Sequence, residues 1–335
     1  DNAIAQEPDE YEFLINTESY YGQLTVDLYD QLYLTGALRN EGSSTFGFSK
    51  KRHWYPKFST AWDFTKKFTN LPLIEYGKLR AAYGEAGVQP GVYTLTSGYF
   101  TGTFGVGWNP ALNLINRGVQ GFRSENTLEN RNVKPERTKE LEFGTNLAFW
   151  NSRIGVDFTF YNARSTDVLF DFNIPPSTGY FQQVQNAAVI ENKGVEVTLD
   201  LAPIKKRNLA WNLSLNFARN RNRVTEMAGR TAEDIRAGRK PEIWESVGRW
   251  AYASPGHPLG EMRLQSWKRF GFGMTAVEDG QLVNIDEKYA GQWKKYDVYV
   301  PANGYPVMAE QEIWSGFDSN PDWTAGLRSE FTLFK

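Results

Sequence analysis

Few residues of this 335-residue chain have the types and spacing that enzymes use for chemistry. The sequence has no cysteine and only two histidines, His53 and His257. No H-x-x-x-H spacing predicts a metal site, and no G-x-S-x-G motif predicts a nucleophilic serine. We interpret both histidines as surface or loop residues, and we expect no enzymatic activity, no bound metal and no cofactor.

Two other sequence features fail as catalytic motifs. The glycines of residues 102–107 occur in the reverse order to a dinucleotide-binding fingerprint and lack a strand-to-helix context, so they predict a flexible loop. The 39 Asp and Glu residues form many pairs, but nothing singles out one pair for glycoside hydrolysis.

Aromatic residues in long, glycine-rich connections are the ones that we expect to contact a substrate. An aromatic ring presents a flat apolar face to a sugar ring or a peptide, and Tyr and Trp add a hydrogen-bonding edge. The alternative is that these rings pack the connections against one another. The candidates are Tyr93, Tyr99, Phe100, Trp108, Tyr180 and Phe181.

Composition narrows the class of protein. Lys and Arg number 37 against 39 Asp and Glu, so the net charge of −2 does not indicate a nucleic-acid binder. No run of apolar residues exceeds four, whereas a transmembrane helix needs about 20, so a helical membrane protein is excluded. A transmembrane β-barrel remains compatible with the mean hydropathy of −0.53, because its strands alternate apolar and polar residues.

Alternation with period two is the dominant pattern and predicts an all-β fold. It indicates about nine strands of roughly ten residues, the length that lets a tilted strand cross a bilayer. The strands are expected at residues 24–28, 32–38, 58–64, 79–83, 141–149, 154–160, 195–201, 209–217 and 323–333.

The connections between these strands alternate between short and long. The short ones are 29–30, 69–76, 151–153 and 203–208, and the long ones are 39–55, 87–137, 167–190 and 226–321. Outer-membrane barrels have short periplasmic turns and long extracellular loops, whereas a soluble β-sandwich has no reason to keep this phase. Within the last connection we expect a short helix at 232–238 and a strand at about 261–270.

The same alternation assigns side chains to two faces of the predicted wall. Facing a hydrated lumen we expect acids, amides and one arginine: Asp63, Glu142, Asn146, Asp157, Glu196, Asp200, Asn212, Asn216, Arg328 and Glu330. Facing lipid we expect Phe143, Leu147, Val156, Phe158, Leu213 and Leu215. The basic clusters 50–52, 205–207 and 219–223 lie at strand ends, where headgroup or solvent contact explains them.

Several motifs, in a fixed order, resemble the SusC/RagA-type TonB-dependent outer-membrane transporters of the Bacteroidetes. They are LRNEGSSTFG at 38–47 with WYPKFS at 54–59, LRAAYG at 79–84, VKPERTKE at 133–140, PPSTGY at 175–180, NA at 186–187 with IENKGVE at 190–196, and NPDW at 320–323. Each motif is short, but together they span about residues 20 to 330.

The resemblance implies a 22-stranded antiparallel barrel that is plugged by an N-terminal domain, energised by TonB at the periplasmic face and covered outside by a SusD-like lipoprotein. Residues 1–335 would then form about nine to ten strands of that barrel domain, with the plug domain and the terminal strands elsewhere. The first residues lack an initiator Met and a signal peptide, so we expect an internal segment of a longer protein.

These observations predict outer-membrane, TonB-dependent uptake of a large nutrient such as an oligosaccharide or a peptide. The expected partners are outer-membrane lipid, a SusD-like lipoprotein, the TonB complex through the plug region and the substrate, with no nucleic acid. The alternative is a soluble secreted β-rich domain that binds or cleaves glycans, which would explain the aromatics and carboxylates but not the phased connections.

Overall fold

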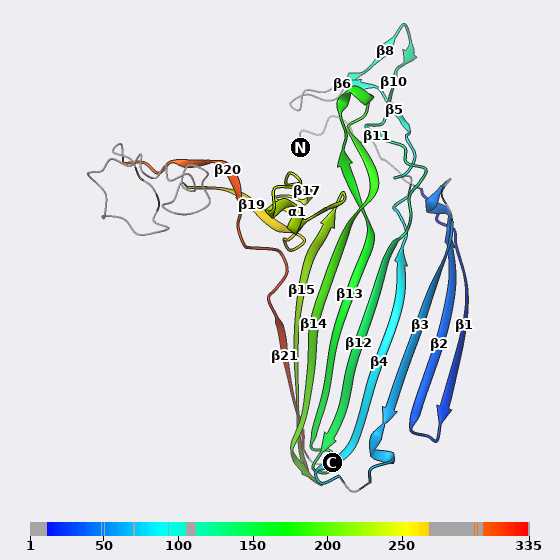
Figure 1. The fold of residues 1–335 in the computed structure, drawn as a ribbon, viewed down its shortest axis with the longest axis vertical. Coiled ribbons are helices and arrows are strands. Elements are labelled where there is room, and N and C mark those ends of the chain that lie inside the picture. Colours follow the sequence, from blue (N-terminus) through cyan, green and yellow to red (C-terminus); the bar gives the residue numbers. More distant parts are fainter. Residues whose placement is uncertain are drawn as a thin grey trace.

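The computed structural model describes residues 12–47, 49, 51–69, 71–92, 94–104, 112–267, 298, 300 and 304–333. Nine long strands lie side by side in one curved, twisted layer (Figure 1), and each pairs antiparallel with the next along the chain. The long strands are β1 (Thr17–Leu28), β2 (Leu32–Ser43), β3 (Arg52–Asp63), β4 (Ile74–Val88), β12 (Glu136–Phe149), β13 (Ile154–Asn173), β14 (Gln182–Lys206), β15 (Leu209–Met227) and β21 (Thr324–Leu333). The all-β barrel-wall prediction is confirmed.

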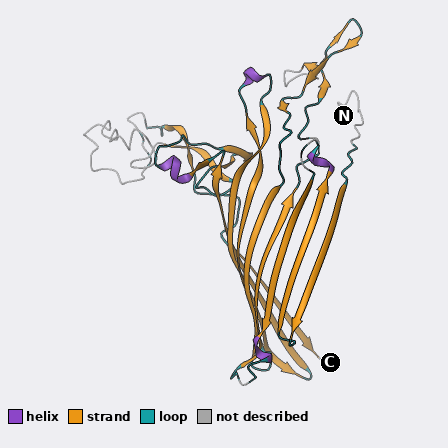
Figure 2. Cartoon of the chain, turned by 45° about the vertical axis from the view of Figure 1, so that its right-hand side comes forward, coloured by secondary structure: helices purple, strands orange, loops and turns teal. Residues whose placement is uncertain are grey.

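Short turns join the strands at one end of the sheet, and the longer connections emerge at the other (Figure 2). We call these the turn end and the loop end. Tyr29 and Asp30 both have positive φ, of 60° and 54°, in the turn between β1 and β2. Such turns have the twist that matches a hairpin of right-handed strands. The turn after β12 is equally tight, with Trp150, Asn151 and Ser152 all at positive φ.

Small elements occupy the connections. The 3-10 helices are η1 (Ser44–Phe46), η2 (Phe64–Lys66) and η3 (Pro176–Thr178). The connection after β4 contains β5 (Tyr99–Thr101), β6 (Thr103–Phe104), β7 (Leu112–Asn113), β8 (Ile115–Asn116), β9 (Val119–Gln120), β10 (Phe122–Ser124) and β11 (Thr127–Leu128). The connection after β15 contains β16 (Arg230–Thr231), α1 (Ala232–Arg236), β17 (Glu245–Gly248), β18 (Ala251–Ala253), β19 (Glu261–Trp267) and β20 (Met308–Trp314), so the expected helix and strand are both present.

Two of the predicted long loops are wrong in extent. Residues 167–190 are mostly strand, because β13 and β14 stay paired as far as Asn173 and Gln182 through bulges near Val168. Only residues 174–181 connect them. Residues 39–55 likewise shrink to a connection at 44–51, since β2 and β3 pair as far as Gly42 and Arg52.

Strand lengths also differ from the expected ten residues. β13, β14 and β15 have 20, 25 and 19 residues, because they continue past the rest of the sheet at the loop end. At the turn end, β14 continues through Pro203 to Lys206. A register shift between Leu201 and Ile204 accommodates this proline, as is usual for proline within a sheet.

The cross-strand register sorts the strand side chains into two faces, as the alternation predicted. One face, which we call the apolar face, carries all six residues expected to face lipid; for example, Val156 lies opposite Leu147 and Leu199, and Leu199 opposite Leu215. The opposite, polar face carries all ten of the expected polar residues. Large apolar side chains stay exposed on the apolar face, with Phe58 at 59% and Phe143 at 48%.

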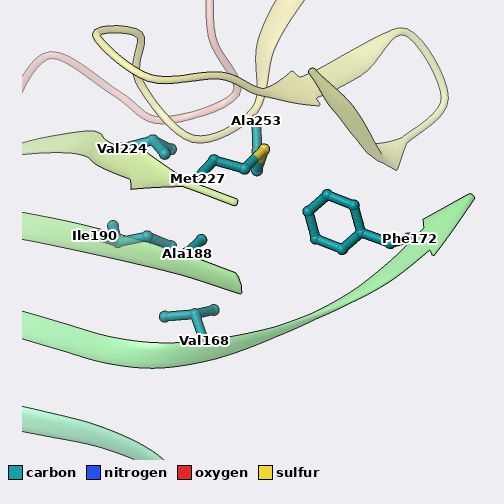
Figure 3. Packing of buried hydrophobic residues seen from close by; sticks show 7 residues of the cluster. All are labelled: Val168, Phe172, Ala188, Ile190, Val224, Met227 and Ala253. Carbon is teal, nitrogen blue, oxygen red and sulfur yellow. The ribbon is translucent and has the colours of Figure 1, made fainter. Parts of the chain in front are cut away.

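Because a single layer encloses no interior, the buried hydrophobic residues gather at the loop end. The main cluster joins the extended parts of β13, β14 and β15 to β18 (Figure 3). Its members are Val168, Phe172, Ala188, Ile190, Val224, Met227 and Ala253. A smaller cluster packs Leu95 and Val133 on Val184, which fixes the connection after β4 against β14.

Strand β15 is paired along one edge by three separate segments, which are β21, residues 256–257 and, at Glu226 and Met227, β16. Its residues Leu209 to Ala218 pair with β21. Beyond them, the Val224 N–H donates to the carbonyl oxygen of His257 at 2.9 Å, and the Gly256 N–H donates to the Val224 carbonyl oxygen at 2.8 Å.

Among the described residues, no helix is long and apolar enough to cross a membrane.

Candidate functional site

The polar face of the sheet has a cavity of about 540 Å³ near the turn end. Half of the predicted polar-face residues line it: Asp200, Asn212, Asn216, Arg328 and Glu330. The Arg328 guanidinium lies 2.7 Å from the Glu330 carboxylate, and both side chains are largely exposed. The cavity therefore presents hydrogen-bond donors and acceptors, and both positive and negative side chains, to a molecule that enters it.

Further along the polar face, side chains interact across neighbouring strands. Asn146 of β12 donates to the Asp157 carboxylate of β13. The Arg80 guanidinium of β4 also contacts Asp157, at 2.9 Å. Thr198 of β14 donates to the Asn216 amide oxygen of β15 at 3.1 Å. The predicted polar residues thus form a hydrogen-bonded strip and do not form an isolated pair of carboxylates.

At the loop end, an asparagine side chain fixes the backbone of a neighbouring connection. Asn186 Oδ1 accepts the Lys134 N–H at 2.8 Å, and Asn186 Nδ2 donates to the Lys134 carbonyl oxygen at 2.8 Å. The same Nδ2 donates to the Asp167 carbonyl oxygen at 2.7 Å. Two of the sequence motifs, at 133–140 and 186–187, therefore meet at a positioning contact.

A second cavity, of about 650 Å³, lies beside this contact. Its charged lining residues are Arg131, Lys134, Arg137 and Asp167, together with His53. The Arg137 guanidinium lies 2.6 Å from Glu85, and Arg131 lies 2.6 Å from Glu129. Much of the positive charge at this cavity is thus already neutralised within the protein.

The described aromatic candidates lie in connections at the loop end. Tyr99 and Phe100 belong to β5 and are 79% and 51% exposed, while Phe181 is 54% exposed. The Phe181 N–H donates to the carbonyl oxygen of Asn126 at 2.8 Å, which ties this connection to the one that carries β5. Tyr180 is adjacent in the same connection, and Tyr93 and Trp108 lie outside the described residues. No ring contact joins the two pairs among the described residues.

A compact cluster in the connection after β15 has no signal in the sequence motifs. The His257 ring stacks on Trp314 with centroids 4.1 Å apart, and its Nδ1 lies 2.8 Å from the Glu261 carboxylate. The Arg263 guanidinium lies 3.8 Å from the Trp244 ring centre and 5.2 Å from that of Trp314. Trp244 and Trp314 are far in the sequence from His257, Glu261 and Arg263, so no local spacing could have indicated these ring contacts.

Metal-ligating side chains do not gather at one place in the described part of the chain. No group of three His, Asp or Glu side chains there could hold a metal ion. What the geometry provides is a polar strip along the strands, with a cavity near the turn end, and a set of exposed rings and charged side chains at the loop end.

Comparison with protein families agrees with this architecture. The family model described as "TonB dependent receptor-like, beta-barrel" matches residues 3–328. The chain belongs to this family of TonB-dependent receptor β-barrels. The family resemblance stated from the sequence motifs is therefore confirmed.

Curated relatives within the TonB-dependent receptors include two with informative names. TonB-dependent receptor P26 of Formosa agariphila is 30% identical over 214 residues, which cover 63% of this chain and 21% of that protein. TonB-dependent receptor SusC of Bacteroides thetaiotaomicron is 27% identical over 237 residues, or 66% of this chain and 22% of that protein. The chain therefore spans about a fifth of the length of the curated relatives that it matches.

Solved structures show the same fold. The structure of the RagAB peptide transporter matches with a TM-score of 0.71 at 19% identity, covering 96% of this chain and 32% of the matched chain. A RagAB structure in an "open-open" state matches equally well, with a TM-score of 0.71. The nine-stranded sheet and its connections thus share the fold of about a third of the matched RagAB chain.

Proposed function

We propose that the intact protein lies in the outer membrane and takes up a large nutrient, an oligosaccharide or a peptide, with energy supplied through TonB. One observation carries the proposal: a two-faced sheet of nine long strands with its longer connections at one end, which is the fold of the RagAB peptide transporter. A SusD-like lipoprotein is the proposed partner at the loop end, and the TonB complex acts through a plug domain.

The two faces give the orientation of the sheet in this proposal. The apolar face contacts lipid, because exposed Phe and Leu side chains at alternate strand positions are typical of the lipid-facing surface of a transmembrane barrel. The polar face lines the hydrated lumen. The turn end is periplasmic and the loop end is extracellular, so the exposed rings of β5 and of residues 174–181 meet the substrate first.

The first test is uptake by the intact transporter in the bacterium that encodes it. Labelled oligosaccharides and peptides are offered to cells that carry the gene, to cells that lack it and to cells without TonB. We expect at least one cargo to enter only when both the transporter and TonB are present. Entry that does not depend on TonB would contradict the proposal.

The aromatic candidates are tested by substitution in the same assay. Replacing Tyr99, Phe100, Tyr180 and Phe181 together by Ala removes rings from the substrate side, and we expect uptake to fall roughly 10-fold or more, because each lost ring contact is worth about 0.5–1.5 kcal/mol. Tyr29→Ala is the matched control, since Tyr29 is 91% exposed but lies in a turn at the opposite end. Equal uptake by both variants would show that these rings do not contact the substrate.

The soluble-domain alternative makes a different prediction for cell fractionation. Cells are lysed without detergent and separated into aqueous and membrane fractions, and the intact protein is followed by immunoblot. The proposal expects it in the membrane fraction until detergent is added. Recovery in the aqueous fraction would favour the soluble glycan-binding domain.

A further inference from the structure

The apolar face ends abruptly along β12 to β15, in the direction of the loop end. The last apolar residues there are Leu141, Phe160, Val195 and Phe217, one on each strand. Cross-strand pairing places Phe160 opposite Val195, and Val195 opposite Arg219. The boundary therefore runs obliquely across the strands, as expected where a membrane surface meets tilted strands.

Cations occupy the positions directly beyond this boundary on the same face. Arg219, Arg221 and Arg223 follow Phe217 at alternate positions of β15, so all three project from the apolar side. Lys193 pairs with Arg221 on β14. One row across four strands reads Lys139, Arg164, Glu191 and Arg223. We call the six cations of this region the rim cations: Lys139, Arg164, Lys193, Arg219, Arg221 and Arg223.

Carboxylates at the rim are too few to neutralise these charges. Glu191 forms ion pairs with two cations, Arg164 at 3.5 Å and Lys193 at 3.1 Å. Glu85 lies 3.8 Å from Lys139. Asp322 lies 2.7 Å from Arg221. Within the described residues, no carboxylate lies within ion-pair distance of Arg219 or Arg223, and the six cations face three acids.

Aromatic rings mark the level at which this positive charge lies. Phe217 and Trp323 stack on the apolar face with ring centroids 6.4 Å apart, directly next to Arg219 in the register. Trp side chains collect where a bilayer meets water, at the depth of the lipid headgroups. Arg219 and Arg221 are the next two residues of β15 on this face beyond Phe217, so they lie at headgroup level. The Arg221 side chain is 57% exposed.

We propose that the rim cations, centred on Arg219, Arg221 and Arg223, bind the phosphate of a lipid headgroup in the outer leaflet. Three guanidinium groups at alternate positions of one strand can each present a planar fork to phosphate oxygens, the geometry for which arginine is better suited than lysine. The acyl chains of the same lipid lie along the apolar residues below. The inference rests on the membrane placement proposed above and adds a lipid site outside the substrate path.

Native mass spectrometry of the purified intact transporter tests the site with bisphosphorylated lipid A as the probe, and with its dephosphorylated form and inorganic phosphate alone as comparisons. The variant R219Q/R221Q/R223Q removes three rim cations. The control R236Q/R239Q/K240Q removes three cations in and after α1, away from the sheet boundary. Because each basic residue near an anionic surface contributes about 1 kcal/mol, we expect roughly a 100-fold loss of lipid A binding in the first variant only.

Three results would overturn the proposal: unchanged lipid A binding by the rim variant, equal binding of dephosphorylated lipid A, or inorganic phosphate that competes fully at millimolar concentration. The last result would identify a site for free phosphate. If the triple variant does not fold, the single variants Arg219→Gln and Arg223→Gln serve in its place, because neither residue has an ion-pair partner among the described residues. Uptake assays on the same variants separate the two proposals, since loss of lipid binding with normal uptake leaves the transport function intact.

Discussion

Arg80 reaches Asp157 across an intervening strand. The guanidinium of Arg80 on β4 lies 2.9 Å from Asp157 Oδ1 and 3.2 Å from Thr159 Oγ1 on β13, and β12 runs between the two strands. Gly144 of β12 is the residue in between, since it pairs with both Arg80 and Thr159. A Cβ at Gly144 would lie 2.9 Å from Arg80 Nη2 and 3.1 Å from the Phe158 carbonyl oxygen. The missing side chain is what lets the guanidinium pass.

Gly144→Val should therefore break this ion pair and destabilise the barrel. We expect a loss of about 1–3 kcal/mol in the free energy of unfolding, because the Val side chain crowds the Phe158 carbonyl oxygen and separates the Arg80 guanidinium from the Asp157 carboxylate. Denaturant titration of the intact protein in lipid vesicles measures it. Gly36→Ala is the control, since its Cβ meets only the Phe58 ring at 3.8 Å. Equal stability of the two variants would contradict this role for Gly144.

The assignment of faces predicts a depth-dependent cost for charge. Phe158→Arg and Leu213→Arg place a cation on the apolar face and should each cost about 2–4 kcal/mol if the position lies near the bilayer midplane. Asn216→Arg, on the polar face, should cost little because the proposed orientation turns this face toward water. Folding into vesicles, followed by denaturant titration, compares the three variants. A cost near zero for both apolar-face variants would show that this face does not contact lipid.

Removing the Asn186 amide should loosen the connection that follows β4. Asn186→Ala deletes three hydrogen bonds to backbone groups of Lys134 and Asp167, with an expected local cost of about 1–3 kcal/mol. Hydrogen exchange of the Lys134 amide should speed up roughly 10-fold or more. Asn186→Asp keeps the acceptor for that amide and should protect it better than Ala does. Unchanged exchange in Asn186→Ala would show that other contacts hold the connection.

The helix α1 should lose stability in acid. Hydrogen bonds from Arg239 and then Thr231 hold the pKa of the Asp234 carboxyl below its ordinary value of 3.8. Because the folded state has the lower pKa, this contribution is complete above pH 3.8 and is lost as the pH falls through the folded value. Hydrogen exchange of the Ala237 amide, corrected for its intrinsic pH dependence, should report the loss. Asp234→Asn should abolish the pH dependence, and a persisting dependence would assign it to another group.

The strands and their two faces could be predicted because period-two alternation is a local property of the sequence. Leu141 to Phe149 and Ile154 to Phe160 alternate cleanly, and the cross-strand register confirms both faces. The extension of β13 and β14 was missed for a physical reason. Residues near Asp167 and Pro175 are typical of loops, and only pairing with the partner strand and burial of Val168 and Phe172 show that these segments are strand.

The arrangement of the connections could be predicted far less well. The contact between Asn186 and Lys134 joins two motifs that are about 50 residues apart, and no spacing indicates that they touch. The stack of His257 on Trp314 likewise depends on tertiary contacts. The aromatic candidates lie at the expected end of the sheet, but their role in substrate contact stays a prediction.

The pairing of β15 with β21 bears on how such a protein can evolve. Ten residue pairs fix this register, while β16 and residues 256–257 pair with β15 and Ala253 packs against it near the start of the segment between the two strands. The entropy of closing a flexible loop grows slowly with length, by about 0.6 kcal/mol for each doubling. Insertions and deletions that spare the parts packed on β15 therefore cost the wall little, so the connection can change in length while the sheet beneath it keeps its register.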